Sequence, residues 1–182
     1  MRKLITVIAI ICVLITAGAV LWFTGVIKIG SKADEETVSS KSVAAMEYMG
    51  SYVILDNQAV VTATLEELPE NIPVITGLEI TTMISGEEIH VENAEGLSYA
   101  LEVVKNLRTV GIDDIEEIFV SSDNDVTLYV KDVKILLGQN VQTSKKLEDL
   151  KNFYSQVLEY SGTLDMQEAD TSNKGYTFKK SE

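Results

Sequence analysis

The feature that most constrains this chain is the run Leu4–Ile27, which contains no charged side chain. A helix of this length reaches roughly 36 Å, enough to cross a bilayer hydrocarbon core of about 30 Å. Arg2 and Lys3 precede the run, and three acidic residues follow at 34–36. A basic start of this kind favours a cytoplasmic N-terminus. We therefore predict a short cytoplasmic start and a single transmembrane helix within residues 1–28.

A cleaved signal peptide is the alternative interpretation of the same segment. The start is basic, and Ala17-Gly18-Ala19 has the small-x-small pattern of a cleavage site. The apolar run continues beyond that site to Ile27, and an exposed N-terminus this apolar is costly in water. This favours the uncleaved anchor, although both interpretations export the remainder of the chain.

The charges are segregated from the apolar residues along the chain. The whole sequence has a net charge of −13 and yet a mean hydropathy of +0.12. The part after residue 28 carries 12 basic and 28 acidic residues, a formal charge of −16. Phosphate binding needs a basic face, so nucleic acid is excluded as a main partner. The only cysteine, Cys12, lies inside the predicted span, so the exported part has no disulfide and no thiolate site.

Composition divides the exported part into a connector over residues 29–47 and a globular domain over residues 48–182. The connector is rich in Ser, Lys, Glu and Ala, and a short, weakly patterned helix is compatible with residues 38–49. In the domain, apolar alternation and turn residues predict strands at 51–55, 60–64, 72–76, 118–120, 126–130, 133–137, 163–166 and 176–178.

Two amphipathic helices complete this pattern. One begins at Asn93 as N-cap and ends at Gly111, and the other runs from about Ser144 to Tyr160, with Gly162 at its C′ position. The order of strands, helix, three-stranded meander, helix and strands predicts an α+β fold. We expect a mostly antiparallel sheet with both helices covering one face.

The side chains of the exported part offer little for catalysis. His90 is the sole histidine, and we expect it to be partly exposed in a strand or loop. The acidic residues at 113–117 and 123–125 are typical of a solvated surface, and Leu128 stands where a calcium-binding loop requires glycine. No glycine fingerprint for nucleotides is present. We therefore predict no catalytic residue, no metal site, no cofactor and no enzyme activity.

The C-terminal strand pair offers a different kind of site. Tyr176-Thr177-Phe178 is short and aromatic, and Lys179 and Lys180 follow it. Such a strand is either a sheet edge protected by charge or an edge that accepts a partner strand. Pattern alone favours the protected edge.

Several segments together resemble the β domain of the FtsQ/DivIB cell-division family over about residues 48–180. These are Tyr52-Val53-Ile54-Leu55-Asp56-Asn57 with Val60-Val61, Leu68-Pro69 through Ile72-Pro73-Val74-Ile75-Thr76-Gly77-Leu78, Ile115-Glu116-Glu117-Ile118, Val133-Lys134-Ile135-Leu136-Leu137-Gly138, Lys146-Leu147-Glu148-Asp149-Leu150 and Leu164-Asp165-Met166. Each motif is weak alone. Their order and spacing behind a predicted span carry the resemblance.

The resemblance implies a non-enzymatic, single-pass scaffold of the bacterial divisome in the cell membrane at the septum, with its C-terminal domain outside the cytoplasm. It implies binding to small coiled-coil division proteins of the FtsB/DivIC and FtsL types, which helps to regulate septal peptidoglycan synthesis. In the family, the last strands and the preceding helix receive a partner strand. On this chain, that face contains Tyr160, Thr163, Leu164, Tyr176 and Phe178. The resemblance therefore favours the interpretation of the last strand as an edge that accepts a partner strand over its interpretation as an edge protected by charge.

One departure from the family is visible in the sequence. Members usually carry a POTRA module between span and β domain, and only the connector over residues 29–47 occupies that place here. Either this is a shortened member of the family or the module has been lost from the sequence, so recruitment through a POTRA module is not predicted from these residues. Two other functions remain open from the residues alone: an exported sensor or ligand-binding module, and a wall hydrolase that uses a pair of acids.

Overall fold

The computed structural model describes residues 42–167 and 175–181. The predicted span and residues 29–41 of the connector lie outside these residues. Among the described helices, none is both long and apolar enough to cross a membrane. The domain itself is an α+β structure, as the sequence predicts, and it is dominated by one sheet that is mostly antiparallel but also contains parallel pairs.

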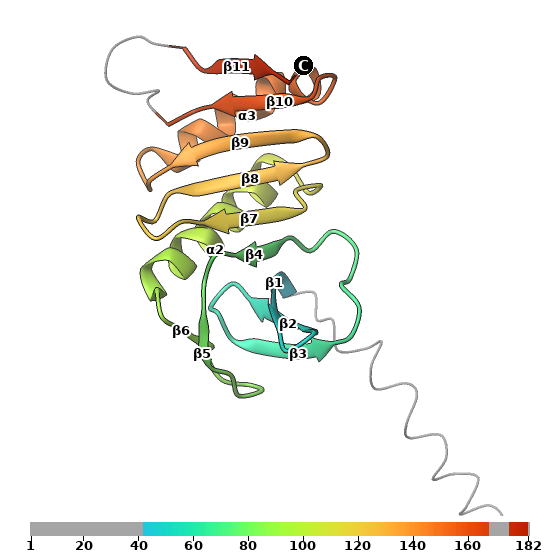
Figure 1. Cartoon of the computed structure of the whole chain (residues 1–182), viewed down its shortest axis with the longest axis vertical. Helices are drawn as coiled ribbons and strands as arrows, with labels where there is room; N and C mark the ends of the chain where they lie inside the picture. The colour runs from blue at the N-terminus through green and yellow to red at the C-terminus, as the bar shows by residue number, and fades with distance from the viewer. Residues whose placement is uncertain (1–41, 168–174, 182) are drawn as a thin grey trace, which may run out of the picture. The chain divides into compact units, whose positions relative to one another are not determined.

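Nine strands form the main sheet in the order β11-β10-β9-β8-β7-β4-β1-β2-β3 (Figure 1). Neighbouring strands are antiparallel except for the parallel pairs β10 with β9, β4 with β7 and β1 with β4. The strand bounds are β1 Ser42–Tyr48, β2 Ser51–Asp56, β3 Val61–Leu65, β4 Val74–Thr76, β7 Glu117–Val120, β8 Val126–Val130, β9 Val133–Gly138, β10 Gly162–Asp165 and β11 Thr177–Lys180. The shorter β5 (Ile80–Thr82) and β6 (His90–Val91) form a separate two-stranded sheet.

Both helices lie behind the strands in the view of Figure 1. Helix α2 spans Ala94–Val110, and the side chain of Asn93 caps it by accepting a hydrogen bond from the Gly96 amide. Gly111 ends the helix in the left-handed conformation, with φ 77°, which glycine adopts without steric cost. Helix α3 spans Thr143–Val157. Both predicted helices and their apolar faces are confirmed.

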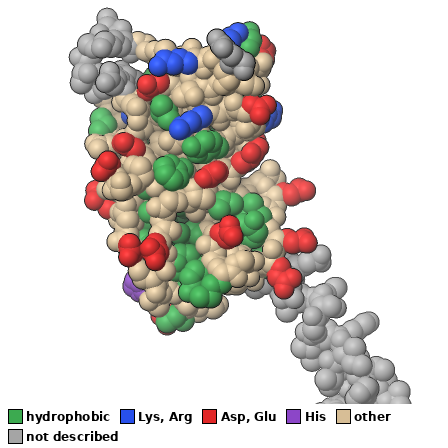
Figure 2. All heavy atoms as spheres, viewed as in Figure 1, with side chains coloured by type: hydrophobic (Ala, Val, Ile, Leu, Met, Phe, Trp, Pro, Cys, Tyr) green, Lys and Arg blue, Asp and Glu red, His purple; other side chains and the backbone are tan. Residues whose placement is uncertain are grey.

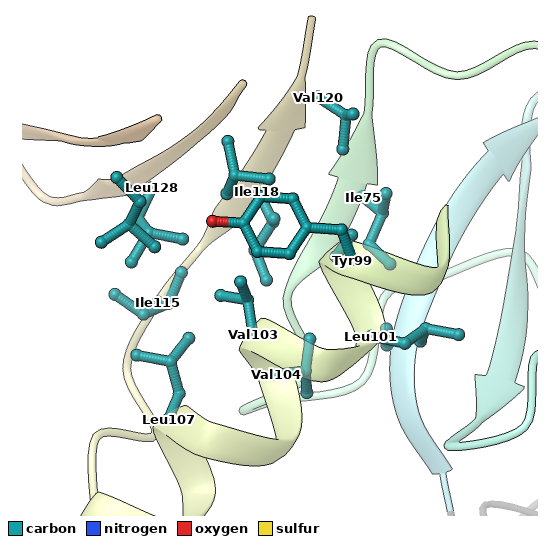
Figure 3. Packing of buried hydrophobic residues seen from close by; sticks show 14 of the residues in the cluster. Ile75, Tyr99, Leu101, Val103, Val104, Leu107, Ile115, Ile118, Val120 and Leu128 are labelled. Atoms are coloured by element: carbon teal, nitrogen blue, oxygen red, sulfur yellow. The ribbon is translucent and has the colours of Figure 1, made fainter. Parts of the chain in front are cut away.

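The main core lies between the helices and the sheet. Figure 3 shows side chains of α2 facing Ile75, Ile118 and Val120 on the strands, with the ring of Tyr99 reaching toward Ile118. Tyr99 is only 4 % exposed, and its hydroxyl donates to the carbonyl of Gly138 at 3.2 Å. A buried hydroxyl without a partner is costly, so this bond fixes where α2 sits beneath the end of β9.

Helix α3 is tied to the sheet by a buried lysine as well as by its leucines. Leu147 and Leu150 are fully buried in the main core. Lys146 is 2 % exposed, and its ammonium group donates to the carbonyl of Leu137 at 2.7 Å. The same group lies 3.4 Å from the carbonyl of Gln167, just after β10. This side chain therefore joins the first turns of α3 to the ends of β9 and β10.

The opposite face of the sheet is covered over β1 and β2 and open over β7 to β10. A small second core of Ala45, Ile54 and Ile72 closes the first part. Over β7 to β10, every second side chain points to this uncovered face, and Phe119 among them is 37 % exposed. Figure 2 shows this open face, with acidic side chains scattered over it and the lysines gathered toward the C-terminal strands.

The structure corrects the interpretation of residues 38–49 as a short helix. Residues Ser42–Tyr48 form β1, which pairs with β2 and β4. The sheet therefore begins before Tyr48, where we placed the start of the globular domain, and includes residues 42–47 of the predicted connector. Ala44 and Met46 belong to the main core, whereas Ala45 between them belongs to the second core. Because both faces of β1 are buried, its sequence lacks the polar-apolar alternation that identifies a strand.

Gly162 also has a different role from the one predicted. Helix α3 ends at Val157 with Leu158 as its C-cap in a right-handed conformation, so Gly162 is not a C′ residue. It is instead the first residue of β10. The strands β10 and β11 pair antiparallel, which confirms the predicted terminal strand pair.

Candidate functional site

Four of the five predicted partner-binding residues surround one concavity. Tyr160, Leu164, Tyr176 and Phe178 line a hollow of about 340 Å³ between the end of α3 and the last two strands. We call this hollow the terminal groove, and its lining is completed by Phe153, Gln156, Val157 and Lys180. Thr163 is not part of it. It lies opposite Lys179 on β11, and its side chain therefore belongs to the open face of the sheet.

Aromatic contacts define the walls of the terminal groove. The ring of Phe153 on α3 lies 5.8 Å from that of Tyr176, and the ring of Tyr160 lies 6.4 Å from that of Phe178. The ammonium group of Lys180 sits 3.4 Å from the centroid of the Tyr160 ring. Tyr160 is 46 % exposed, so the groove presents an apolar and aromatic surface to solvent with one cation at its rim.

Two tyrosine–carboxylate hydrogen bonds join the middle and the C-terminal end of α3 to neighbouring segments. The hydroxyl of Tyr176 donates to Asp149 at 2.7 Å, and that of Tyr154 donates to Asp114 at 2.6 Å. Burial raises the pKa of Tyr176 above its ordinary value, and the hydrogen bond and negative charge of Asp149 raise it further. Burial and Asp114 act in the same way on the pKa of Tyr154. Each bond requires the protonated phenol.

The stability of the domain should therefore fall under alkaline conditions. A tyrosine whose pKa is raised in the folded state contributes stability that is complete below the unfolded pKa of about 10 and is lost as pH rises beyond it. We expect the urea midpoint of unfolding to decrease between about pH 9 and pH 11. The Tyr154→Phe variant should be less stable than the wild type at neutral pH, but its urea midpoint should decrease less between about pH 9 and pH 11. Identical pH dependence in the two proteins would contradict this.

The backbone of β11 adds a second recognition element beside the groove. The amide of Ser181 donates to the carbonyl of Ser161 at 2.9 Å, which makes this a hydrogen-bonded pair. Hydrogen-bonded and non-hydrogen-bonded pairs alternate along an antiparallel ladder. The register then places Phe178 and Lys180 in non-hydrogen-bonded positions, so their N–H and C=O groups point away from β10. Within the described residues, no strand pairs with this outer edge.

The other edge of the sheet is capped over its first residues. The amide of Val61 at the start of β3 donates to the carbonyl of Glu87, and its own carbonyl accepts from Gly86, both at 2.9 Å. The amide of Ile89 donates to the carbonyl of Ala59, and Val60 forms a bridge with Glu88. The β11 edge has no such cover within the described residues, so the two edges of the sheet differ in how far their backbone groups are paired.

The remaining candidates from the sequence do not converge on a reactive site. His90 is exposed in β6, as predicted, and lines a separate concavity of about 380 Å³ with Glu88, Glu102 and Lys105. No cluster of three or more metal-binding side chains occurs in the part of the chain that the structure describes.

The resemblance implied that the helix before the last strands takes part, but no residue of α3 itself was predicted from the sequence for this site. Asp149, Phe153, Val157 and Tyr160 follow each other three or four residues apart, and all contact or face β11. This spacing lies on one side of a helix and was readable in the sequence. Only the structure shows that this side of α3 lies against the C-terminal strands as well as the main core.

Comparison with known proteins gives one family match. The model of the family "Cell division protein FtsQ/DivIB, C-terminal" matches residues 44–170. Tyr160, Thr163 and Leu164 lie within the matched region, whereas Tyr176 and Phe178 lie beyond its end. No curated protein matches the sequence significantly. The matched region covers most of the chain and contains both helices and ten of the eleven strands, all but β11, in whole or in large part. The chain therefore belongs to the FtsQ/DivIB family of cell-division proteins.

Proposed function

We propose that this protein is a non-enzymatic, membrane-anchored scaffold of the divisome that binds small coiled-coil proteins of the FtsB/DivIC and FtsL types. By holding these partners at the septum it helps to regulate septal peptidoglycan synthesis. Two observations together carry the proposal: no strand within residues 42–167 and 175–181 pairs with the outer edge of β11, and the apolar terminal groove lies beside that edge. Family membership supports the role in cell division.

Strand addition at β11 explains how such a partner would be recognised. The N–H and C=O groups of Phe178 and Lys180 point outward and are ready to pair with an added strand. The side chains of the same two residues line the terminal groove. An added strand would therefore gain affinity from main-chain hydrogen bonds and specificity from an apolar side chain that enters the groove.

The sequence supports the anchoring part of the proposal. The uncharged run Leu4–Ile27 has the length of a membrane span, and the basic start favours a cytoplasmic N-terminus. The domain would then lie outside the cytoplasm, where coiled-coil division proteins expose their own extracytoplasmic segments. Purification of the full chain from membranes with its partners tests anchor and scaffold together.

A backbone test separates strand addition from side-chain contact. We compare Lys180→Pro with Lys180→Ala, because both remove the lysine side chain and only proline removes the outward-pointing N–H. Proline is tolerated at a strand edge where the N–H does not pair with the sheet. In co-purification with the FtsB/DivIC-type protein of the same genome, we expect Lys180→Pro to bind about tenfold more weakly than Lys180→Ala.

Equal affinity of the two variants would show that the partner does not pair with the backbone of β11. Failure of the wild-type chain to retain any FtsB/DivIC- or FtsL-type protein would overturn the scaffold proposal as a whole. Circular dichroism of both variants establishes that each retains the sheet.

A further inference from the structure

Gly162 lies directly beneath the strand edge that we assign to partner binding. It begins β10 and pairs with Lys180 on β11 on one side and with Val133 on β9 on the other. Its backbone is therefore enclosed between two strands, and it is buried. The residue follows Tyr160, a wall of the terminal groove, by two positions.

A side chain at this position would collide with the edge strand. A Cβ atom built on Gly162 would lie 2.3 Å from the carbonyl oxygen of Lys179, 2.9 Å from Cζ of Phe178 and 3.0 Å from Cα of Lys180. All three atoms belong to β11, and two of them are backbone atoms that cannot move without moving the strand. The close approach of β11 to β10 thus depends on the missing side chain.

The position of β11 in turn fixes the geometry of the terminal groove. Phe178 and Lys180 contact Tyr160 from β11, through ring centroids 6.4 Å apart and a cation 3.4 Å above the ring. An outward shift of β11 would separate these side chains from α3. It would also change the direction of the N–H and C=O groups that point out from the edge.

We infer that Gly162 is a positioning residue for partner binding: the absence of a side chain lets β11 lie close to β10, and this sets both the width of the terminal groove and the register of the free edge. The inference rests on the proposed function for its binding consequence. The placement of β11 itself can be measured without any partner.

Two glycine variants near β11 form a matched pair. Gly162→Ala introduces the colliding Cβ, whereas Gly175→Ala adds the same methyl group just before β11, where nothing lies within 4 Å. Both changes lower the freedom of the unfolded chain by about the same amount. Because Gly162 also has φ 159°, a difference between the variants reports the close approach of β11 together with the backbone conformation that accompanies it.

The experiment combines hydrogen exchange with binding on the full chain in detergent. We expect Gly162→Ala to accelerate amide exchange in β11 by about tenfold or more relative to the wild type, with β7 and β8 unchanged. We expect its affinity for the FtsB/DivIC-type protein of the same genome to fall by about tenfold. Gly175→Ala should match the wild type in both measurements.

The possible results separate the inference from the proposed function. Unchanged exchange of β11 in Gly162→Ala, or an equal change in Gly175→Ala, would overturn the positioning role. Accelerated exchange with unchanged affinity would retain the placement of β11 but refute its link to binding, and with it the proposed edge. Loss of protection throughout the sheet would mean that Gly162 serves general stability, which also overturns the inference.

Discussion

The Phe178→Asp variant of the full chain is expected to bind the FtsB/DivIC-type partner at least about 100-fold more weakly than the wild type. Phe178 lies opposite the buried Leu164, so its side chain faces α3 and lines the terminal groove. A carboxylate there would be desolvated by an incoming apolar side chain and would lose the aromatic contact with Tyr160. Isothermal titration or co-purification from membranes measures the effect.

The control for this variant carries the same substitution on the other face of the sheet. Phe119 on β7 is 37 % exposed on the open face and takes no part in the terminal groove. Phe119→Asp should keep the wild-type affinity within about twofold, since residues outside the buried centre of an interface contribute little. Equal losses in both variants would indicate a general defect of the domain, and full affinity in Phe178→Asp would exclude the groove as the site.

The second large effect is expected for stability at the centre of the sheet. Ile135 on β9 is fully buried against the helices, whereas its neighbour Leu136 points to the open face and is only partly buried. Ile135→Ala should lower the free energy of unfolding by about 3 kcal/mol, because it removes buried methyl groups and leaves a cavity. Leu136→Ala should cost about 1 kcal/mol.

Urea unfolding followed by circular dichroism compares the two alanine variants under identical conditions. A cost for Leu136→Ala equal to that for Ile135→Ala would show that the open face is covered in the protein as purified. That result would point to a further partner or to a second copy of the chain on this face.

Most helices and strands were predictable where one face is buried and the other is exposed to solvent, because the sequence then alternates between apolar and polar residues. Helix α2 shows this in its caps, Asn93 and Gly111, and the meander β7 to β9 shows it in closely spaced turns. Strand β1 was missed because Ala44 and Ala45 face two different cores and leave no alternation. The parallel pairs with β4 were also missed, since contacts between strands distant in sequence leave no local pattern.

The site was predictable in part and for a different reason. The aromatic residues of β11 and Tyr160 were identified by resemblance, and the structure brings them together with Leu164. Thr163 was included because it lies in the same strand, yet strand alternation turns it to the other face. The contact of Lys180 was missed because a lysine at the end of a strand is usually only a solvated charge; here it is exposed and also lies over the ring of Tyr160.

The interior place of β1 bears on how the domain would withstand mechanical load. The chain enters the sheet from its N-terminal side through β1, which is held by β2 on one side and by β4 on the other. Tension applied at Ser42 acts along the strand, so the hydrogen bonds to β2, which run across it, are loaded together in shear rather than opened one after another. If the chain is anchored as we propose, a load applied at Ser42 would enter the sheet through a strand loaded in shear, at a distance of six strands in the sheet order from β11.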